Sequence, residues 1–250
     1  MENLKFIFDI DGTLTPSRRK IDPDFHEYFL DFTHKNDVYL VTGSNREKTI
    51  EQIGESLFNA CKRVYNCAGN DVYEGDKNVY RTPWELPDEG RRFLQDELDY
   101  SVFPIRTGTH IEKRPGCVNF SILGRGATFE EREVYKQWDN EREERVDIAG
   151  RFNDRFPDLY AFVGGETGVD ISIKGADKSQ ILRDFKQGDE LRFFGDRMDE
   201  NGNDYPLAIA IAQKHLGYAF QVDGYKDVWE MLKKKTHALL PKRSRITGTK

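Results

Sequence analysis

The feature that most constrains the fold is a short apolar segment near the start of the chain that ends in two acidic residues. Leu4–Phe8 has the length and the aromatic and β-branched content of a buried strand, and Asp9, Asp11 and Gly12 follow it. Ligands of α/β sheets bind beyond the carboxyl ends of parallel strands, and a glycine there permits a sharp turn. Two carboxylates so close repel each other unless a cation lies between them, and Mg2+ prefers such oxygen ligands. We therefore expect an α/β fold with a Mg2+-dependent site at this strand end.

An acidic pair alone is also typical of a solvated turn, so its surroundings decide the interpretation. The acids lie between a strand and Gly12-Thr13-Leu14-Thr15. This combination resembles the first motif of the haloacid dehalogenase (HAD) superfamily of phosphoryl-transfer enzymes. The resemblance implies three later features: a strand ending in Thr or Ser, a lysine at the start of a late helix, and another strand ending in acids.

The later sequence supplies all three features. The strand at residues 38–41 ends at Thr42, whose hydroxyl lies beside a predicted helix start, a place suited to a phosphoryl oxygen. Lys178 precedes a predicted helix at residues 179–185, and a strand at residues 191–194 is followed by acids. By the resemblance, Asp9 attacks phosphorus and forms an aspartyl-phosphate, Asp11 transfers the proton, and Thr42 and Lys178 contact the transferred group. The implied metal site consists of Asp9, the main-chain carbonyl of Asp11, Asp196 and, as a brace for the metal or for Lys178, Asp204.

The middle of the chain follows a different pattern of elements. Residues 82–177 read as helix, two strands, helix and two strands, which predicts an antiparallel sheet with helices on one face. The second helix, over residues 129–156, is long and highly charged, with a possible break near Gly150. We therefore predict a discontinuous Rossmann-like HAD core at residues 1–81 and 178–250, with an inserted α+β cap of the C2 type at residues 82–177.

The predicted cap carries several arginines. Considered without any family resemblance, they would be interpreted as residues that form salt bridges on the surface. Their placement beside Gly164-Gly165 and Asp170, together with residues 8–21 and 193–204, closely resembles the eukaryotic-type phosphomannomutases. The resemblance implies that several guanidinium groups bind the distal phosphate of a sugar, as bidentate donors can, and that Asp170 binds a sugar hydroxyl. The implied phosphate ligands are Arg18, Arg114, Arg125 and Arg132.

Three positions depart from that family. Gly168 stands where the family has a serine that contacts the sugar. Thr42-Gly43-Ser44 replaces Gly-Gly-Ser and is closer to sugar phosphatases of the same superfamily, and Ala210 replaces an acid near a second cation. We therefore expect one Mg2+, and the choice of mannose or glucose stays open.

Composition limits the remaining possibilities. The chain has 250 residues and a net charge of −6, which disfavours nucleic acid as a partner. Its three cysteines fit neither a disulfide framework nor a zinc site, so we expect reduced thiols. The sequence offers no signal-type segment and no run of about 18 apolar residues, so we expect a cytoplasmic protein without membrane contact. The basic residues 242–250 read as a disordered tail.

The predicted function is that of a phosphohexomutase, which interconverts mannose 6-phosphate and mannose 1-phosphate with hexose 1,6-bisphosphate as intermediate or activator. The alternative is a HAD-type sugar-phosphate phosphatase, in which water takes the phosphoryl group from the aspartyl-phosphate. Four arginines for a second phosphate favour the mutase, and a complete catalytic set disfavours a mere binding protein. The resemblance further implies a homodimer formed through the cap and a role in GDP-mannose biosynthesis.

Overall fold

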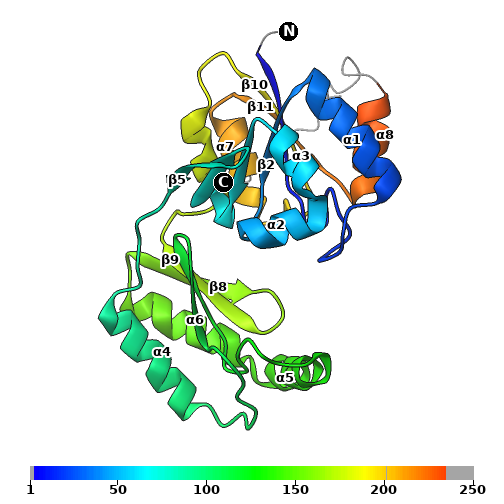
Figure 1. The fold of residues 1–250 in the computed structure, drawn as a ribbon. Coiled ribbons are helices and arrows are strands. Elements are labelled where there is room, and N and C mark those ends of the chain that lie inside the picture. Colours follow the sequence, from blue (N-terminus) through cyan, green and yellow to red (C-terminus); the bar gives the residue numbers. More distant parts are fainter. Residues whose placement is uncertain (1–2, 201, 235–250) are drawn as a thin grey trace. The chain divides into compact units, whose positions relative to one another are not determined.

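The structure, a computed structural model, describes residues 3–200 and 202–234 (Figure 1). The predicted disordered tail at residues 242–250 lies outside the described residues. The chain divides into two compact units. Of the described residues, 3–41, 47–64, 184–200 and 202–234 form the first unit, and 42–46 and 65–183 form the second. The predicted domain boundaries at residues 81/82 and 177/178 stay a prediction.

A seven-stranded sheet has the order β11-β10-β1-β2-β3-β4-β5. The pairs β11/β10, β10/β1 and β1/β2 are parallel, whereas β4 and β5 are antiparallel. Strand β1 therefore lies between β10 and β2, where both of its edges are hydrogen-bonded. The strands are β1 (Leu4–Phe8), β2 (Asp37–Val41), β3 (Arg63–Asn66), β4 (Asp71–Glu74), β5 (Lys77–Arg81), β10 (Glu190–Gly195) and β11 (Gly217–Gln221).

The core of the first unit is built around aromatic side chains. Phe8 stacks on Phe194 of β10 at 4.8 Å between ring centroids and meets Phe29 edge-on at 4.9 Å. Such pairs anchor helix α1 and β10 to β1. The Asp22 side chain begins α1 by accepting hydrogen bonds from two backbone N–H groups of its first turn. The helices are α1 (Pro23–Lys35), α2 (Arg46–Ile53), α3 (Glu55–Ala60), α7 (Tyr205–Gln213) and α8 (Tyr225–Lys233).

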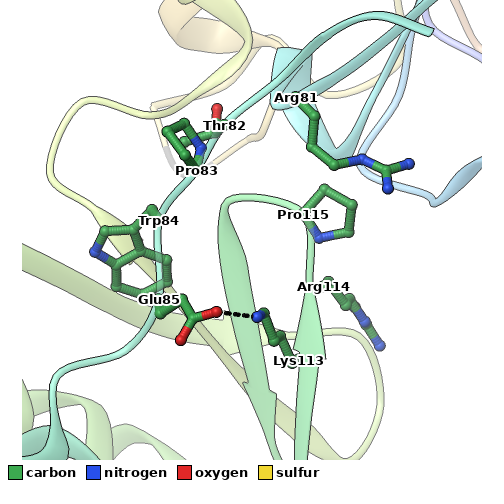
Figure 2. Close-up of a pocket in the computed structure, with 8 residues that line it drawn as sticks. All are labelled: Arg81, Thr82, Pro83, Trp84, Glu85, Lys113, Arg114 and Pro115. Carbon is green, nitrogen blue, oxygen red and sulfur yellow. Dashed lines mark hydrogen bonds and ion pairs between the residues drawn. The ribbon is translucent and has the colours of Figure 1, made fainter.

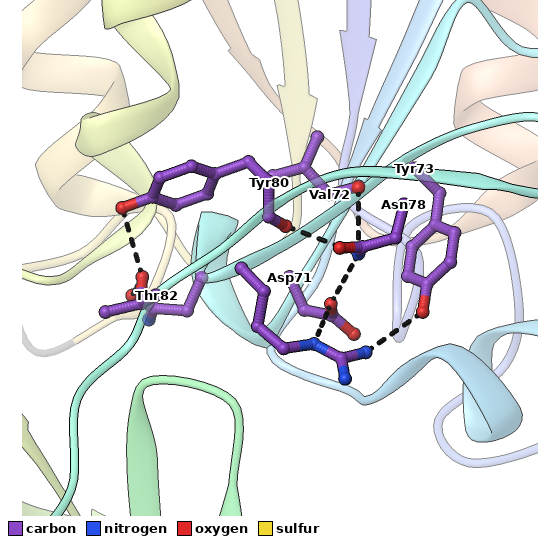
Figure 3. Close-up of polar contacts among 8 residues, drawn as sticks. Asp71, Val72, Tyr73, Asn78, Tyr80 and Thr82 are labelled. Atoms are coloured by element: carbon purple, nitrogen blue, oxygen red, sulfur yellow. Dashed lines mark hydrogen bonds and ion pairs between the residues drawn. The ribbon is translucent and has the colours of Figure 1, made fainter.

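The hairpin of β4 and β5 belongs to the second unit and turns at Gly75, as the sequence predicts. Its buried acid, Asp71, accepts hydrogen bonds of 2.8 Å from both Arg81 and Asn78 (Figure 3). Arg81 also donates to the Tyr73 hydroxyl at 3.0 Å. These contacts cross the hairpin from strand to strand, so they fix its register beside a bulge between Val72 and Tyr73.

A separate four-stranded antiparallel sheet of the second unit has the order β6-β7-β9-β8. One face is apolar: Val118, Phe120, Val169 and Ile171 are buried there in one cluster with side chains of the helices. The elements are α4 (Asp88–Tyr100), β6 (Ile111–Arg114), β7 (Cys117–Phe120), α5 (Phe129–Arg142), α6 (Glu144–Arg155), β8 (Leu159–Gly164) and β9 (Gly168–Ile173).

The predicted long helix over residues 129–156 is two helices, and the expected break near Gly150 is wrong. The chain breaks at Glu143, which adopts a left-handed conformation (φ 54°). Asp139 near the end of α5 accepts hydrogen bonds from the Arg145 backbone N–H at 2.9 Å and from its guanidinium at 2.7 Å. This buried pair ends one helix and begins the next, whereas Gly150 lies inside α6.

Other elements follow the predicted order with changed bounds. The segment after Lys178 is a 3-10 helix, η2 (Lys178–Asp184), and a one-turn 3-10 helix, η1 (Cys67–Gly69), follows β3. The predicted fold class is confirmed, with a parallel-rich sheet and a separate antiparallel sheet. Among residues 3–200 and 202–234, no helix combines the length and apolar character that crossing a membrane requires.

Candidate active site

Three carboxylates of the first unit meet beyond the end of β1. Asp9, Asp196 and Asp204 each offer an oxygen within 4.8 Å of the others. Asp9 and Asp204 are buried, and the Asp9 backbone N–H donates to the Phe194 carbonyl at 2.9 Å, which ties the end of β1 to β10. Three acids so close together repel one another unless a cation joins them, so this donor set fits a hard divalent ion such as Mg2+.

Glycines let the chain approach these acids closely. A Cβ atom at Gly12 would lie 2.4 Å from a carboxylate oxygen of Asp196, and one at Gly195 would lie 2.5 Å from an oxygen of Asp204. Gly12 also has a φ of 94°, which side chains other than glycine rarely adopt. Asp204 is held further by the Arg197 backbone N–H, which donates to its carboxylate at 3.1 Å. The shape of the acidic cluster therefore depends on two residues without side chains.

The Asp11 carboxylate is not part of this cluster. It accepts a hydrogen bond from the Gln52 side-chain amide at 3.0 Å and another from the Arg18 backbone N–H. Gln52 is buried in α2 and also donates to the Thr15 hydroxyl at 3.3 Å, while its own amide oxygen has no hydrogen-bond partner among the described residues. Arg18 itself has a φ of 57° and an exposed side chain. The predicted use of the Asp11 main-chain carbonyl as a metal ligand stays a prediction.

A cavity of about 670 Å³ opens beside the acidic cluster in the first unit. Asp196 and Gly12 line it, together with residues 15–17 and 222–227. This cavity gives a ligand access to the carboxyl end of β1.

Thr42 and Lys178 both belong to the second unit. Thr42 directly follows β2 and is buried, and its hydroxyl accepts the Ser44 backbone N–H at 3.1 Å. Lys178 begins η2 and is buried as well. A lysine is seldom buried without an anionic or hydrogen-bonding partner, so its position is consistent with a functional role. The roles of both residues stay predictions.

Two of the predicted phosphate-binding arginines meet at one acid of the four-stranded sheet β6-β7-β9-β8, which we call the cap sheet. Arg114 donates to the Glu112 carboxylate at 2.9 and 2.7 Å, and Arg125 lies 2.5 Å from the same oxygen. Arg114 also lies 3.6 Å from Asp170. The sequence therefore identified two guanidinium groups that do lie together, but it missed Glu112, the residue that joins them.

Asp170 is held by its neighbours in the sheet. Asn119 donates to its carboxylate at 2.6 Å, and burial raises the pKa of Asp170, although Asn119 and Arg114 oppose the shift. Gly168 leaves the space that Asn119 needs, because a Cβ atom there would lie 2.6 Å from the Asn119 amide nitrogen. In this chain Gly168 thus makes room for an amide that positions Asp170.

Arg132 lies apart from these pairs, on the first turns of α5. Within residues 3–200 and 202–234 its guanidinium forms no ion pair. A capping box of Thr128 and Glu131 fixes the start of this helix. A guanidinium held on a capped helix without a carboxylate partner is available to an anionic ligand.

A second cavity, of about 540 Å³, lies in the second unit where the chain leaves β5 (Figure 2). Residues 81–85 and 113–115 line it, and Lys113 binds Glu85 across it. Neighbouring side chains of a strand point to opposite faces of the sheet. Lys113 therefore points to Glu85 of the cavity wall, whereas Arg114 lies on the face that carries Glu112.

Comparison with known proteins agrees with this fold. A haloacid dehalogenase-like hydrolase from Bacteroides thetaiotaomicron has a similar structure, with a TM-score of 0.62 and 13% identity over 92% of this chain and 98% of that one. The phosphomannomutases of Drosophila melanogaster and Spinacia oleracea are 32% and 31% identical to this chain. The alignments cover 82% and 80% of this chain, and 86% and 84% of those proteins.

The fold is that of a haloacid dehalogenase-like α/β protein with an additional antiparallel-sheet unit. The sequence profile of eukaryotic phosphomannomutases matches residues 25–236. The chain belongs to the eukaryotic phosphomannomutase family. Because the matched region begins after Asp9 and Asp11, the assignment of these two acids depends on their motif and on the geometry of the site.

Proposed function

We propose that this protein is a phosphohexomutase that moves a phosphoryl group between O6 and O1 of mannose or a closely similar hexose. The single observation that carries this proposal is the meeting of Asp9, Asp196 and Asp204 at the carboxyl end of β1, in a chain of the phosphomannomutase family. The paired arginines of the cap support a substrate with a second phosphate.

In the first half-reaction a carboxylate oxygen of Asp9 attacks phosphorus, and the bond from phosphorus to the departing oxygen breaks. Asp11 gives a proton to that oxygen. In the second half-reaction a sugar hydroxyl attacks the aspartyl-phosphate, Asp11 takes the hydroxyl proton, and Asp9 is restored. Thr42 donates a hydrogen bond to the transferred group and Lys178 adds positive charge beside it.

Asp9, Asp196 and the Asp11 carbonyl would hold Mg2+, with Asp204 bracing the set. When bound, the ion neutralises negative charge on the phosphoryl group. Removal of Mg2+ with EDTA is expected to abolish labelling of Asp9 by a phosphorylated donor, and added Mg2+ should restore it.

The cap would hold the phosphate that is not being transferred. Arg114, Arg125, Arg132 and Arg18 bind this distal phosphate, and Asp170 accepts a hydrogen bond from a sugar hydroxyl. Hexose 1,6-bisphosphate is the intermediate, which must rebind with its phosphates exchanged, and it also primes Asp9. A homodimer formed through the cap, a cytoplasmic location and a role in GDP-mannose biosynthesis complete the proposal.

The decisive experiment supplies mannose 1-phosphate with and without hexose 1,6-bisphosphate and measures both mannose 6-phosphate and free phosphate. A mutase forms mannose 6-phosphate in a bisphosphate-dependent reaction. Release of phosphate without isomerisation would instead identify a sugar-phosphate phosphatase, which the Thr42-Gly43-Ser44 segment also permits. In parallel, Asp9→Asn should abolish labelling, whereas Asp154→Asn, at an exposed acid of α6, should leave it unchanged.

A further inference from the structure

The outer face of the cap sheet carries an aromatic pair beside the predicted sugar-binding acid. The apolar face of this sheet packs against the helices, so alternate residues of each strand lie on the other face. The strand register places Phe162 of β8 directly opposite Asp170 of β9, and Tyr160 two residues along β8. Both aromatic side chains therefore share the face that bears Asp170 and Arg114.

These two rings form one surface. Their centroids lie 5.8 Å apart and their planes differ by 23°. Phe162 is 41% exposed and Tyr160 49% exposed. Strand β8 is the last strand of its sheet, and exposed edge strands more often carry charged side chains, which discourage unwanted pairing. Two stacked rings at such a position are best explained by a ligand that covers them.

The polar neighbours indicate the chemistry of that ligand. Directly opposed residues in antiparallel strands have Cβ atoms about 4.5–5.5 Å apart, so Phe162 is the neighbour of Asp170 on β8. The Asp170 carboxylate itself lies against Gly164, two residues along β8 on the same face. Arg114 of β6 approaches the same carboxylate on the same face of the sheet, from the side of β9 opposite to β8. This face of the sheet therefore presents a cation, a hydrogen-bond acceptor and an aromatic surface, on β6, β9 and β8 respectively. A phosphorylated hexose has the matching parts: a phosphate, hydroxyl groups around its ring, and an apolar face of C–H groups.

We propose that Phe162, supported by Tyr160, is the wall on which the hexose ring stacks while Asp170 binds its hydroxyl groups. This inference rests on the proposed function and adds residues that select for a ring-shaped substrate. Neither ring could be singled out from the sequence, because an aromatic residue in a strand normally indicates core packing.

The test compares Phe162→Ala and Phe162→Tyr with the control Val163→Ala. Val163 is the next residue of β8 and is 38% exposed, but it lies in the row of the other face. We expect Phe162→Ala to raise KM for mannose 1-phosphate about tenfold and to weaken hexose phosphate binding equally in calorimetry. Phe162→Tyr and Val163→Ala should stay within about twofold.

A second substrate separates stacking from a general defect. Acetyl phosphate is a phosphoryl donor for Asp9 that has no sugar ring. In Phe162→Ala, the factor by which its KM rises should therefore be at least five times smaller than the factor for mannose 1-phosphate. Equal effects on both substrates, or an unchanged KM, would overturn the inference. So would a dimeric wild type that dissociates in sedimentation on substitution of Phe162, because the rings would then belong to an interface between copies.

The outcomes distinguish this inference from the proposed function. If the wild type binds hexose phosphates and loses this affinity in Phe162→Ala, but never isomerises them, the stacking wall stands and the mutase assignment fails. If isomerisation proceeds normally in Phe162→Ala at low substrate concentration, the mutase assignment stands and the stacking wall fails.

Discussion

Replacing Gln52 with methionine tests the contact that holds Asp11. Methionine has nearly the length and volume of glutamine but no hydrogen-bond donor, so the variant removes the 3.0 Å bond to the Asp11 carboxylate without opening a cavity. The Arg18 backbone N–H remains as the second donor. The variant should therefore leave Asp11 present but less well oriented for proton transfer.

The size of the effect follows from the type of bond. A hydrogen bond to a charged group contributes about 1.5–3 kcal/mol. If Asp11 transfers the proton in both half-reactions, loss of its orientation should lower kcat about 10- to 100-fold, since 1.4 kcal/mol corresponds to about a factor of ten. Gln52→Glu should be at least as harmful, because it places a second carboxylate beside Asp11.

The assay is steady-state isomerisation of mannose 1-phosphate together with thermal unfolding. We expect kcat to fall while KM and the binding of hexose phosphate change little, because Gln52 does not reach the cap arginines through any described contact. Gln95→Met is the matched control, since Gln95 also donates to a carboxylate, that of Asp99 at 2.9 Å, on the exposed side of α4. An unchanged kcat in Gln52→Met, or a loss explained by unfolding alone, would refute the positioning role.

Three further predictions concern the cap. Arg132→Ala should raise KM for hexose phosphates about tenfold or more by removing a charge-assisted contact, with thermal stability unchanged; unaltered kinetics would exclude Arg132 from the site. Arg145→Met should lower the free energy of unfolding by about 3–5 kcal/mol in urea titration, because it leaves the Asp139 charge buried, whereas exposed Arg151→Met should cost less than about 1 kcal/mol. Burial raises the pKa of Cys117 to about 12, so iodoacetamide at pH 8 should label this thiol in urea but not in the native protein.

The sequence predicted those parts of the site that depend on short segments. The end of β1 was identifiable because a buried strand, two acids and a glycine occur within nine residues, from Leu4 to Gly12. Asp196 could be singled out for the same reason, because it directly follows another apolar strand, and Asp204 lies eight residues further along the chain. The order of elements likewise predicted both sheets, because the change from alternating strands and helices is visible along the chain.

Features that depend on contacts between distant residues could not be predicted. Gln52 reads as an ordinary helix residue, and its bond to Asp11 spans 41 positions of the chain. The Asn119 side chain occupies the space that Gly168 leaves on the neighbouring strand. Neither residue alone indicates this contact in the sequence. No glycine or proline marks the helix break at Glu143. The contact between Asp139 and Arg145, on either side of Glu143, fixes this break instead.

The carboxylate of Glu112 has a consequence for turnover. It pairs with both Arg114 and Arg125, so the three groups together keep one net positive charge. If these arginines bind phosphate as proposed, an arriving phosphate must compete with this acid for the two guanidinium groups, and a departing one leaves both paired with Glu112. We therefore expect the pair to exchange anions readily instead of trapping them. A bisphosphorylated sugar that dissociates, reorients and binds again requires phosphate binding that is readily reversible.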